Sequence, residues 1–182
     1  MSAAPAASAS APPAGTVAIP AAALAARTAE LAAAVAATQP AGDLLLVSLL
    51  PPGAAFASAL SAALALPHTL AYARVSPYRR GAEPARLEGE LPQLSGRAVL
   101  VVEGVVDTGL TLRVAVRELS AQRPASVEAC VLLDRPRRRL VEALPLRHAG
   151  FVADDRVYAG YGIPWRGRLA ELPDLCLVDE PR

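Results

Sequence analysis

The chain has 182 residues and a formal net charge of +1, which is the size of one domain and gives no overall field to attract nucleic acid or an anionic membrane. All 18 of its basic residues are arginine, which excludes any mechanism that needs a lysine Schiff base or a Walker-type phosphate lysine. Its two cysteines, Cys130 and Cys176, lie in apolar runs and show no zinc-ligand spacing, so we expect buried thiols in a reduced, cytoplasmic protein.

The first residues of the chain differ in composition from the rest. Residues 1–18 consist mainly of Ala, Pro and Ser and carry no charge, so we expect them to form a disordered tail before a single domain at 19–182. The tail lacks the basic start and the leucine-rich run of a signal peptide. No stretch of about 18 bulky apolar residues predicts a membrane-spanning helix.

From Ile19 onward the pattern becomes helical and then alternates. A helix is predicted after Pro20, with Leu24, Leu31 and Val35 on one face. The remaining predicted elements are strands at 43–50, 69–75, 97–103 and 126–133 and helices at 54–66 and 110–122.

A polar excursion rich in Pro and Gly occupies residues 76–96 between two of these strands. Its length indicates a binding loop, a lid or a hairpin extension.

The alternation of apolar strands with helices predicts an α/β fold whose parallel sheet is covered on both faces. Ligands of such sheets bind beyond the carboxyl ends of the strands. The segments to inspect are therefore 50–53, 76–81, 103–111 and 134–139.

The stretch VVDTGLT lies between a buried strand and a helix. Thr108, Gly109 and Thr111 at a helix start can present backbone N–H groups and two hydroxyls to one anion, aided by the helix dipole. The alternative is an ordinary helix cap, because Asp107 and Thr108 are good N-cap residue types.

Several segments in consistent order resemble one family. VLVVEGVVDTGLTL is similar to the phosphoribosyl-diphosphate (PRPP) binding signature of the type I phosphoribosyltransferases, and the hypoxanthine-guanine branch is the most similar one. ARVSPYRRG resembles the segment with the family's flexible loop, CVLLDRPRRR its purine-side strand, and GFVADDRVYAGYGIPWRGRLAELPDLCLV its hood. The resemblance implies a central, mainly parallel sheet with a small hood built from the N-terminal helix and residues 148–180.

The resemblance also implies roles for the residues around the signature. Asp107 matches the aspartate near the purine N7 that is proposed to transfer a proton. Glu103 matches the first of two adjacent acids that face the ribose hydroxyls and Mg²⁺. The residues that match the binding cup for the 5-phosphate are Thr108, Gly109, Leu110 and Thr111.

On the purine side, Arg135 stands where the family usually has a lysine that contacts the 6-oxo group. Val157 stands where an aromatic residue usually stacks on the purine, and Tyr158 or Trp165 are the candidates to replace it. Ser76 and Tyr78 resemble the mobile loop that closes over the reacting atoms.

The chain departs from the family pattern mainly on the pyrophosphate and metal side. Two prolines remove N–H donors from the pyrophosphate loop, although a Leu50–Pro51 bond can be cis at low cost. Arg166 and Arg168 are candidates to replace a missing pyrophosphate arginine. The divergent positions are Pro51, Pro52, Gly104, Pro164 and Ala170.

Other charged groups have ordinary interpretations. The run RPRRR at 135–139 predicts a solvated loop or helix start with Arg135 alone pointing inward, rather than a nucleic-acid patch. Asp154 and Asp155 predict a turn, and His68 and His148 are expected to be structural.

The function implied by the resemblance is transfer of phosphoribosyl from PRPP to hypoxanthine or guanine, with Mg²⁺, giving the nucleoside monophosphate and pyrophosphate. The alternative is a catalytically impaired nucleotide- or PRPP-binding regulatory protein on the same fold. A third interpretation is a structural partner of an active phosphoribosyltransferase. We expect no nucleic-acid or membrane partner, and the resemblance leaves a homo-oligomer open.

Overall fold

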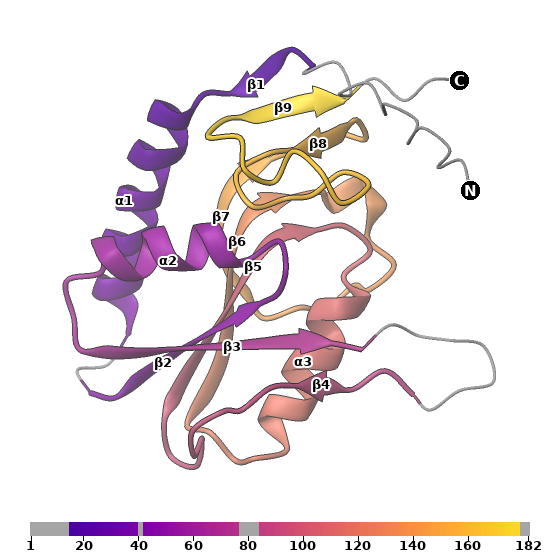
Figure 1. Ribbon diagram of the computed structural model, residues 1–182. Coiled ribbons are helices and arrows are strands. Elements are labelled where there is room, and N and C mark those ends of the chain that lie inside the picture. Colours follow the sequence, from indigo (N-terminus) through magenta and orange to yellow (C-terminus); the bar gives the residue numbers. More distant parts are fainter. Residues whose placement is uncertain (1–14, 40–41, 77–83, 179–182) are drawn as a thin grey trace, which may run out of the picture.

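The computed structural model describes residues 15–39, 42–76 and 84–178. Its main feature is a six-stranded sheet in the order β4-β3-β2-β5-β6-β7 (Figure 1). All neighbouring strands are parallel except β4, which runs antiparallel to β3. The strands are β2 (Leu44–Leu49), β3 (His68–Val75), β4 (Leu87–Glu88), β5 (Ala98–Val106), β6 (Ser126–Asp134) and β7 (Leu146–Val152). The predicted fold class is confirmed.

Within the described residues three α-helices cover the sheet. The central strands β2 and β5 are mostly apolar because both faces are buried, with Ser48 and Glu103 as their buried polar residues. Residues Leu46 and Leu100 face α1 and α2, whereas their neighbours Leu45 and Val99 face α3. Successive strand residues point to opposite faces, so a continuous apolar run is needed for two cores. The helices are α1 (Ala21–Thr38), α2 (Ala54–Ala63) and α3 (Leu110–Ser120), and a short 3-10 turn, η1, spans Pro136–Arg138.

Helix α1 is long and apolar enough, by length and composition alone, to cross a membrane. Its buried stripe includes Leu24, Leu31 and Val35, the face that the periodicity predicted, and these residues pack into the core against the sheet. Thr28 lies on the same face, and its hydroxyl donates to the carbonyl of Leu24 at 2.8 Å, which satisfies the buried polar atom. The packing is that of a core helix in a globular domain.

The chain order creates a crevice at the centre of the sheet. From β2 the chain crosses to β3 on one side through α2, and from β5 it crosses to β6 on the other side through α3. Right-handed crossovers in opposite directions place these helices on opposite faces, as the two core clusters show. The carboxyl ends of β2 and β5 therefore flank a topological switch point, where ligands of such folds bind.

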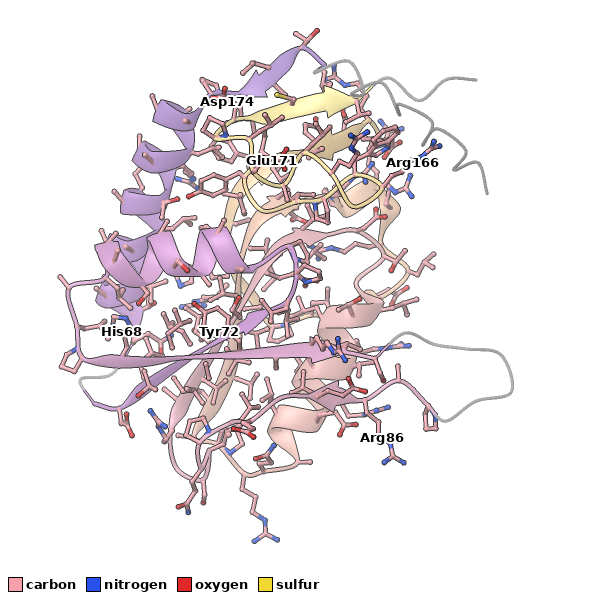
Figure 2. The ribbon with its side chains drawn as sticks, viewed as in Figure 1. His68, Tyr72, Arg86, Arg166, Glu171 and Asp174 are labelled. Carbon is pink, nitrogen blue, oxygen red and sulfur yellow. The ribbon has the colours of Figure 1, made fainter. Side chains whose placement is uncertain are left out.

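A second, three-stranded sheet forms a hood at one end of the molecule, with the order β1-β9-β8 (Figure 1). Its strands come from both ends of the described chain: β1 (Val17–Ile19), β8 (Val157–Ala159) and β9 (Leu175–Val178). Asp174 in the hood lies beside the start of α1 (Figure 2), and its carboxylate accepts from the Ala21 N–H at 2.6 Å.

The structure draws the boundaries of the tail and hood differently from the sequence. Val17 and Ala18 were assigned to the disordered tail, but they form β1 because β9 supplies an antiparallel partner. Helix α1 and the strand that contains His148 were assigned to the hood, but both belong to the main sheet layer. Residues 1–14 of the expected tail lie outside the described residues.

Candidate active site

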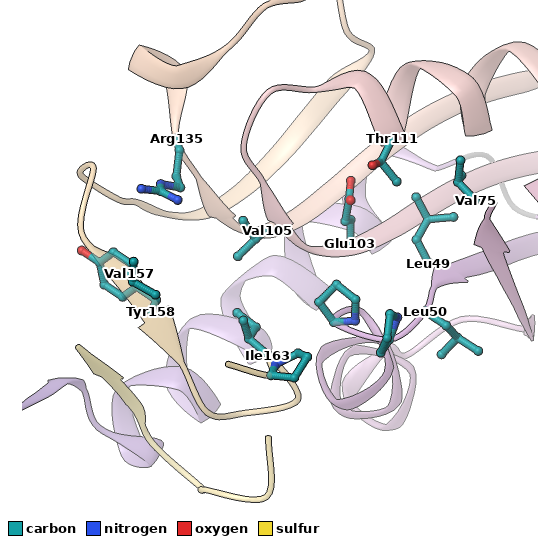
Figure 3. Close-up of a pocket in the computed structure, with 13 residues that line it drawn as sticks. Leu49, Leu50, Val75, Glu103, Val105, Thr111, Arg135, Val157, Tyr158 and Ile163 are labelled. Atoms are coloured by element: carbon teal, nitrogen blue, oxygen red, sulfur yellow. The ribbon is translucent and has the colours of Figure 1, made fainter. Parts of the chain in front are cut away.

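A cavity of about 470 Å³ lies at the carboxyl ends of the central strands, between the sheet and the hood (Figure 3). Three of the four tip segments identified from the sequence, 50–53, 103–111 and 134–139, contribute to its wall. Its lining residues are Leu49, Leu50, Pro51, Pro52, Val75, Glu103, Val105, Thr111, Arg135, Val157, Tyr158, Ile163 and Pro164. The structure therefore brings Glu103, Thr111 and Arg135 together around one cavity. Val157 and Tyr158 of the hood line the same cavity.

Glu103 carries the carboxyl group that lines this cavity. The residue is only 5% exposed, and within the described part of the chain its Oε2 has no hydrogen-bond partner. Burial away from water raises the pKa of this carboxyl to about 8. Its carboxyl points toward the side of the cavity where Thr111 lies (Figure 3). At neutral pH this group is therefore largely a neutral acid that can both donate to and accept from a ligand.

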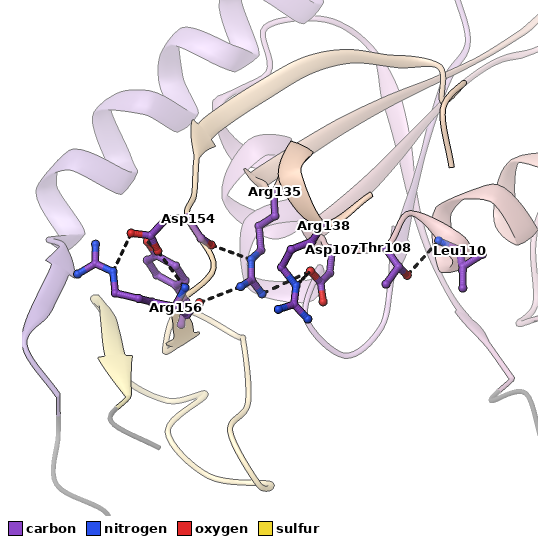
Figure 4. A network of polar contacts seen from close by, with 8 residues as sticks. Asp107, Thr108, Leu110, Arg135, Arg138, Asp154 and Arg156 are labelled. Carbon is purple, nitrogen blue, oxygen red and sulfur yellow. Dashed lines mark hydrogen bonds and ion pairs between the residues drawn. The ribbon is translucent and has the colours of Figure 1, made fainter. Parts of the chain in front are cut away.

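The start of α3 presents unpaired backbone donors beside the same cavity. Gly109 precedes the helix with φ +79°, a left-handed conformation that glycine adopts without strain. Among the described residues, the N–H groups of Thr108, Gly109 and Thr111 donate to no protein acceptor, and the N–H of Leu110 makes only a 3.4 Å contact with the Thr108 hydroxyl (Figure 4). An eleven-residue helix with open N-terminal amides is a site for an anion.

Asp107 is held by two arginines that the sequence analysis did not connect with it. The Arg138 Nε donates to its Oδ1 at 2.5 Å, and an Arg135 terminal nitrogen lies 3.5 Å from the same oxygen (Figure 4). The Asp107 side chain remains 35% exposed, but Asp107 is not among the described residues that line the cavity. The basic run 135–139 was the available signal, but its pairing with Asp107 depends on the turn of η1.

Arg135 is anchored by the backbone of the hood entry. Its Nε donates to the carbonyl of Asp154 at 2.9 Å and its Nη2 to the carbonyl of Arg156 at 3.1 Å. The sequence predicted a donor to the purine 6-oxo group, and the side chain does line the cavity, but these donors are already used. The expectation that Arg135 alone points inward is wrong, because the Arg139 side chain is only 18% exposed and pairs with Asp134.

The turn at 154–158 is stabilised from within. Asp154 accepts from the Arg156 backbone N–H and guanidinium and from the Tyr158 hydroxyl. The backbone hydrogen bond from Arg156 is the main cause that lowers the pKa of Asp154. Tyr158 therefore turns its hydroxyl toward Asp154 while it and Val157 line the cavity. This acidic position serves a turn, as the sequence predicted.

Ser76 hydrogen-bonds across the base of the polar excursion. Its backbone N–H donates to the carbonyl of Arg86 at 2.8 Å, and its hydroxyl accepts from the Arg86 N–H at 2.9 Å. Strand β4 pairs antiparallel with β3 just beyond this contact, so the described ends of the excursion lie side by side. Tyr78, the other residue of the expected flexible loop, lies outside the described residues.

The divergent positions on the opposite side of the cavity have clear places. Leu50–Pro51 is a cis peptide bond, as the sequence allowed, and Pro51, Pro52 and Pro164 line the cavity. Arg166, suggested as a substitute for the missing arginine, stacks on Trp165 with its Cζ 4.7 Å from the ring centroid, on the hood (Figure 2).

The other suggested substitute, Arg168, pairs its backbone with Trp165, and like Arg166 it is absent from the described cavity lining. Ala170 uses its carbonyl to accept from Gly162. Neither arginine is therefore positioned to replace the missing one.

Both histidines have structural contacts, as expected. His68 contacts the Ser61 hydroxyl at 2.7 Å and the Leu66 carbonyl at 2.8 Å. His148 is buried, which lowers its pKa, and it lies 3.4 Å from the Thr38 hydroxyl.

A model of the phosphoribosyl transferase domain family matches residues 19–148. The chain belongs to the phosphoribosyltransferase family. The matched region contains the central sheet up to the start of β7 and the whole stretch from Glu103 to Thr111. Most of the residues that line the cavity at the switch point therefore lie in the part of the chain that matches the family.

Relatives and solved structures place the chain near the hypoxanthine-guanine branch. It is 32% identical over 145 residues to a hypoxanthine phosphoribosyltransferase of Salmonella typhimurium, covering 76% of this chain and 81% of the relative. It is also 32% identical over 148 residues to a hypoxanthine-guanine phosphoribosyltransferase of Mycobacterium avium, covering 79% of this chain and 72% of the relative.

Two solved structures share the whole architecture of this phosphoribosyltransferase. The hypoxanthine-guanine phosphoribosyltransferase of Bacillus anthracis superposes with a TM-score of 0.83 at 25% identity, covering 90% of this chain and 98% of that one. The hypoxanthine phosphoribosyltransferase of Trypanosoma cruzi in complex with the product IMP gives a TM-score of 0.82 at 25% identity, covering 90% and 93%. The family resemblance inferred from the motifs is confirmed.

Proposed function

We propose that this chain transfers the phosphoribosyl group of PRPP to N9 of hypoxanthine or guanine and releases pyrophosphate. The observation that carries the proposal is the combination of open amides at the start of α3 with the buried carboxyl of Glu103, groups that lie beside one cavity and lack protein partners among the described residues. Family membership and the relatives' activities support the substrate class.

The 5-phosphate end of the substrate would lie at the start of α3. The N–H groups of Thr108, Gly109 and Thr111 and the two threonine hydroxyls can each donate to a phosphate oxygen, and the positive end of the helix dipole favours the anion. Glu103 would receive the ribose hydroxyls, because a buried carboxyl without a partner gains most from new hydrogen bonds.

Asp107 would manage the proton of the base. As the bond from C1′ to the diphosphate oxygen breaks and N9 bonds to C1′, the base loses a proton at N7, which the Asp107 carboxylate can accept. Arg138 and Arg135 hold that carboxylate in place, and Arg135 also lines the cavity. The purine would then lie between Asp107 and the hood residues Val157 and Tyr158.

Magnesium is part of this proposal, and the described residues could supply only a small part of its ligands. Among the described residues no cluster of three or more acidic, His or Cys side chains exists, so Glu103 would be the single acidic side chain of the cavity lining beside an ion held mainly by substrate phosphate oxygens and water. Magnesium supplies charge neutralisation to the departing diphosphate.

A reducing, cytoplasmic setting agrees with two free, buried thiols.

The direct test is an assay of the purified full chain with PRPP, Mg²⁺ and each of hypoxanthine, guanine, xanthine and adenine. Nucleoside monophosphate is separated by chromatography and pyrophosphate is measured in a coupled reaction. We expect product from at least hypoxanthine or guanine, and loss of about a hundredfold in kcat for Asp107→Asn with thermal stability checked in parallel. Folded chain that makes no nucleotide from any base would contradict the proposal.

A second candidate is a regulatory protein that binds a nucleotide without turnover. It is favoured by Pro51, Pro52 and Pro164, which wall the cavity where donors to a diphosphate are needed. Calorimetry that detects tight binding of nucleoside monophosphate in a chain without activity would select it.

Homo-oligomerisation is also proposed, since the oligomeric state of the Trypanosoma cruzi relative has been a subject of study; sedimentation of the full chain tests it.

A further inference from the structure

The loop between β2 and α2 offers no backbone donor over five consecutive residues. Pro51 and Pro52 have no N–H. The Leu50 N–H donates to the carbonyl of Ala73 at 2.8 Å, the Gly53 N–H to that of Leu49 at 2.9 Å, and the Ala54 N–H to that of Pro51 at 3.3 Å. Every amide from Leu50 to Ala54 is therefore absent or already used, so an anion beside this loop finds none of the donors that surround one at the start of α3.

The first amide beyond this loop is covered by the hood. The N–H of Ala55 has no acceptor among the described residues, but Gly162 lies directly over it. A Cβ at position 162 would be 3.4 Å from the Ala55 nitrogen and 2.9 Å from its Cβ. A phosphate group could reach this amide only if the hood moved away.

The loop is also held in this position from the sheet side. A Cβ at position 104 would lie 2.1 Å from the carbonyl oxygen of Pro52 and 2.7 Å from its carbonyl carbon. The loop thus fills the volume that the second acid of the family pattern would need. Gly104 and the Pro51–Pro52 pair are one structural change and not two separate losses.

Positive charge is missing from the same end of the cavity. Among its described lining residues the only cation is Arg135, and Figure 3 shows it at the opposite end from Leu50. Its guanidinium is held by two carbonyls of the hood entry and by Asp107. A diphosphate carries more negative charge than a single phosphate ester, and here it would meet proline rings and a carbonyl oxygen.

We propose that this site selects ligands with a single 5-phosphate and gives the diphosphate of PRPP no affinity of its own, so that nucleoside 5′-monophosphates bind more tightly than PRPP. The inference rests on the proposed function, because it concerns the same cavity. PRPP is then held by its 5-phosphate and ribose, with its diphosphate solvated by water and Mg²⁺. The selectivity comes from the contact between Pro52 and Gly104, which closes the diphosphate end.

Calorimetry on the unaltered full chain tests this directly, with ribose 5-phosphate, IMP, PRPP and inorganic pyrophosphate as probes, each with and without Mg²⁺. We expect IMP to bind at least about tenfold more tightly than PRPP, PRPP to bind within about threefold of ribose 5-phosphate, and pyrophosphate not to compete with IMP. PRPP binding as tightly as IMP, or competition by pyrophosphate, would overturn the inference and leave the proposed function standing. Absence of binding by every probe would overturn both.

A variant pair adds a second readout. Pro52→Gly restores one N–H to the loop and loosens its contact with Gly104, so we expect affinity for PRPP to rise about threefold to tenfold while affinity for ribose 5-phosphate is unchanged. Pro67→Gly is the matched control, because Pro67 is exposed and lies just before the start of β3, at the amino ends of the strands and away from the cavity. Equal changes for PRPP and ribose 5-phosphate in Pro52→Gly would count against the closed diphosphate end.

Discussion

The carbonyl oxygen of Pro52 occupies the space beside Gly104 that any other residue would need for its Cβ, at a distance of only 2.1 Å from that position. Real Cβ atoms do not approach a backbone oxygen so closely, so a side chain at 104 must displace the loop after β2. The contact joins the loop after β2 to the carboxyl-terminal part of the neighbouring strand β5. Because β5 is buried along its length, the sheet cannot move to make room.

Gly104→Ala is therefore expected to destabilise the fold by about 1–3 kcal/mol, as overpacking of a well-packed site usually does. Urea denaturation monitored by circular dichroism measures the change. If the Pro52 contact is the cause, Gly104→Ala combined with Pro52→Gly will lose less stability than the sum of the two single variants. Pro52→Gly keeps the clashing carbonyl but frees the backbone that holds it, so additive losses would show that the loop does not move away from position 104.

Thr111→Val removes one hydroxyl from the proposed phosphate site and keeps the shape of the side chain. Thr111 is exposed at the start of α3 and lines the cavity, and among the described residues no protein group contacts its hydroxyl. We expect affinity for ribose 5-phosphate to fall by about tenfold with little change in thermal stability. Ser120→Ala, at the far end of the same helix, serves as the control and should leave binding unchanged.

Glu103→Gln is expected to change the pH dependence of stability. Burial raises the pKa of Glu103 from 4.5 to about 8, so the folded chain keeps a proton that the unfolded chain releases above pH 4.5. The carboxyl therefore costs stability progressively as pH rises from about 4.5 to 8, whereas below that window it is protonated in both states. Glutamine cannot ionise, so the variant should gain on the order of 1 kcal/mol per pH unit across this window relative to the unaltered chain.

Thermal unfolding at pH 5 and pH 8 measures this effect. The melting temperature of Glu103→Gln should rise relative to the unaltered chain between the two values. Glu90→Gln, at an exposed position, is the matched control and should follow the unaltered chain. A difference between Glu103→Gln and the unaltered chain that stays constant with pH would contradict a buried, neutral Glu103.

Arg135→Lys is expected to loosen the entry to the hood although the charge is kept. A lysine cannot reproduce the planar set of bonds by which Arg135 reaches the carbonyls of Asp154 and Arg156 at once. Stability should fall by about 1–3 kcal/mol, and amide exchange should become faster at 154–158. Arg137→Lys changes an exposed neighbour in the same run and should leave exchange there unaltered. Unchanged exchange in Arg135→Lys would mean that the turn at Asp154 holds the hood entry by itself.

The sheet and its covering helices could be predicted because their signals are local. Continuous apolar runs such as 44–49 indicate strands buried on both faces, and the regular spacing of Leu24, Leu31 and Val35 indicates the buried face of a helix. The stretch from Asp107 to Thr111 was recognisable for the same reason, since a glycine between a strand and a helix specifies the turn by itself.

Other features depended on groups far apart in the chain. A three-residue strand at Val17–Ile19 has no pattern of its own and exists only because β9 offers its edge. The pairing of Asp107 with Arg138 required the turn of η1, and the position of Arg135 required the hood carbonyls. Local sequence determines which backbone conformation is low in free energy. Hydrogen bonds and steric contacts between distant segments form only when the chain has packed.

The sequence alone thus determined the α/β architecture through short-range periodicity, and its resemblance to the phosphoribosyltransferases located the proposed phosphate-binding turn. It also indicated that Pro51, Pro52 and Gly104 were unusual. Only the tertiary structure decided that these are one feature, since the carbonyl of Pro52 and the empty face of Gly104 meet only after β2 and β5 pair. Two atoms cannot share one volume, and that exclusion is visible only in three dimensions.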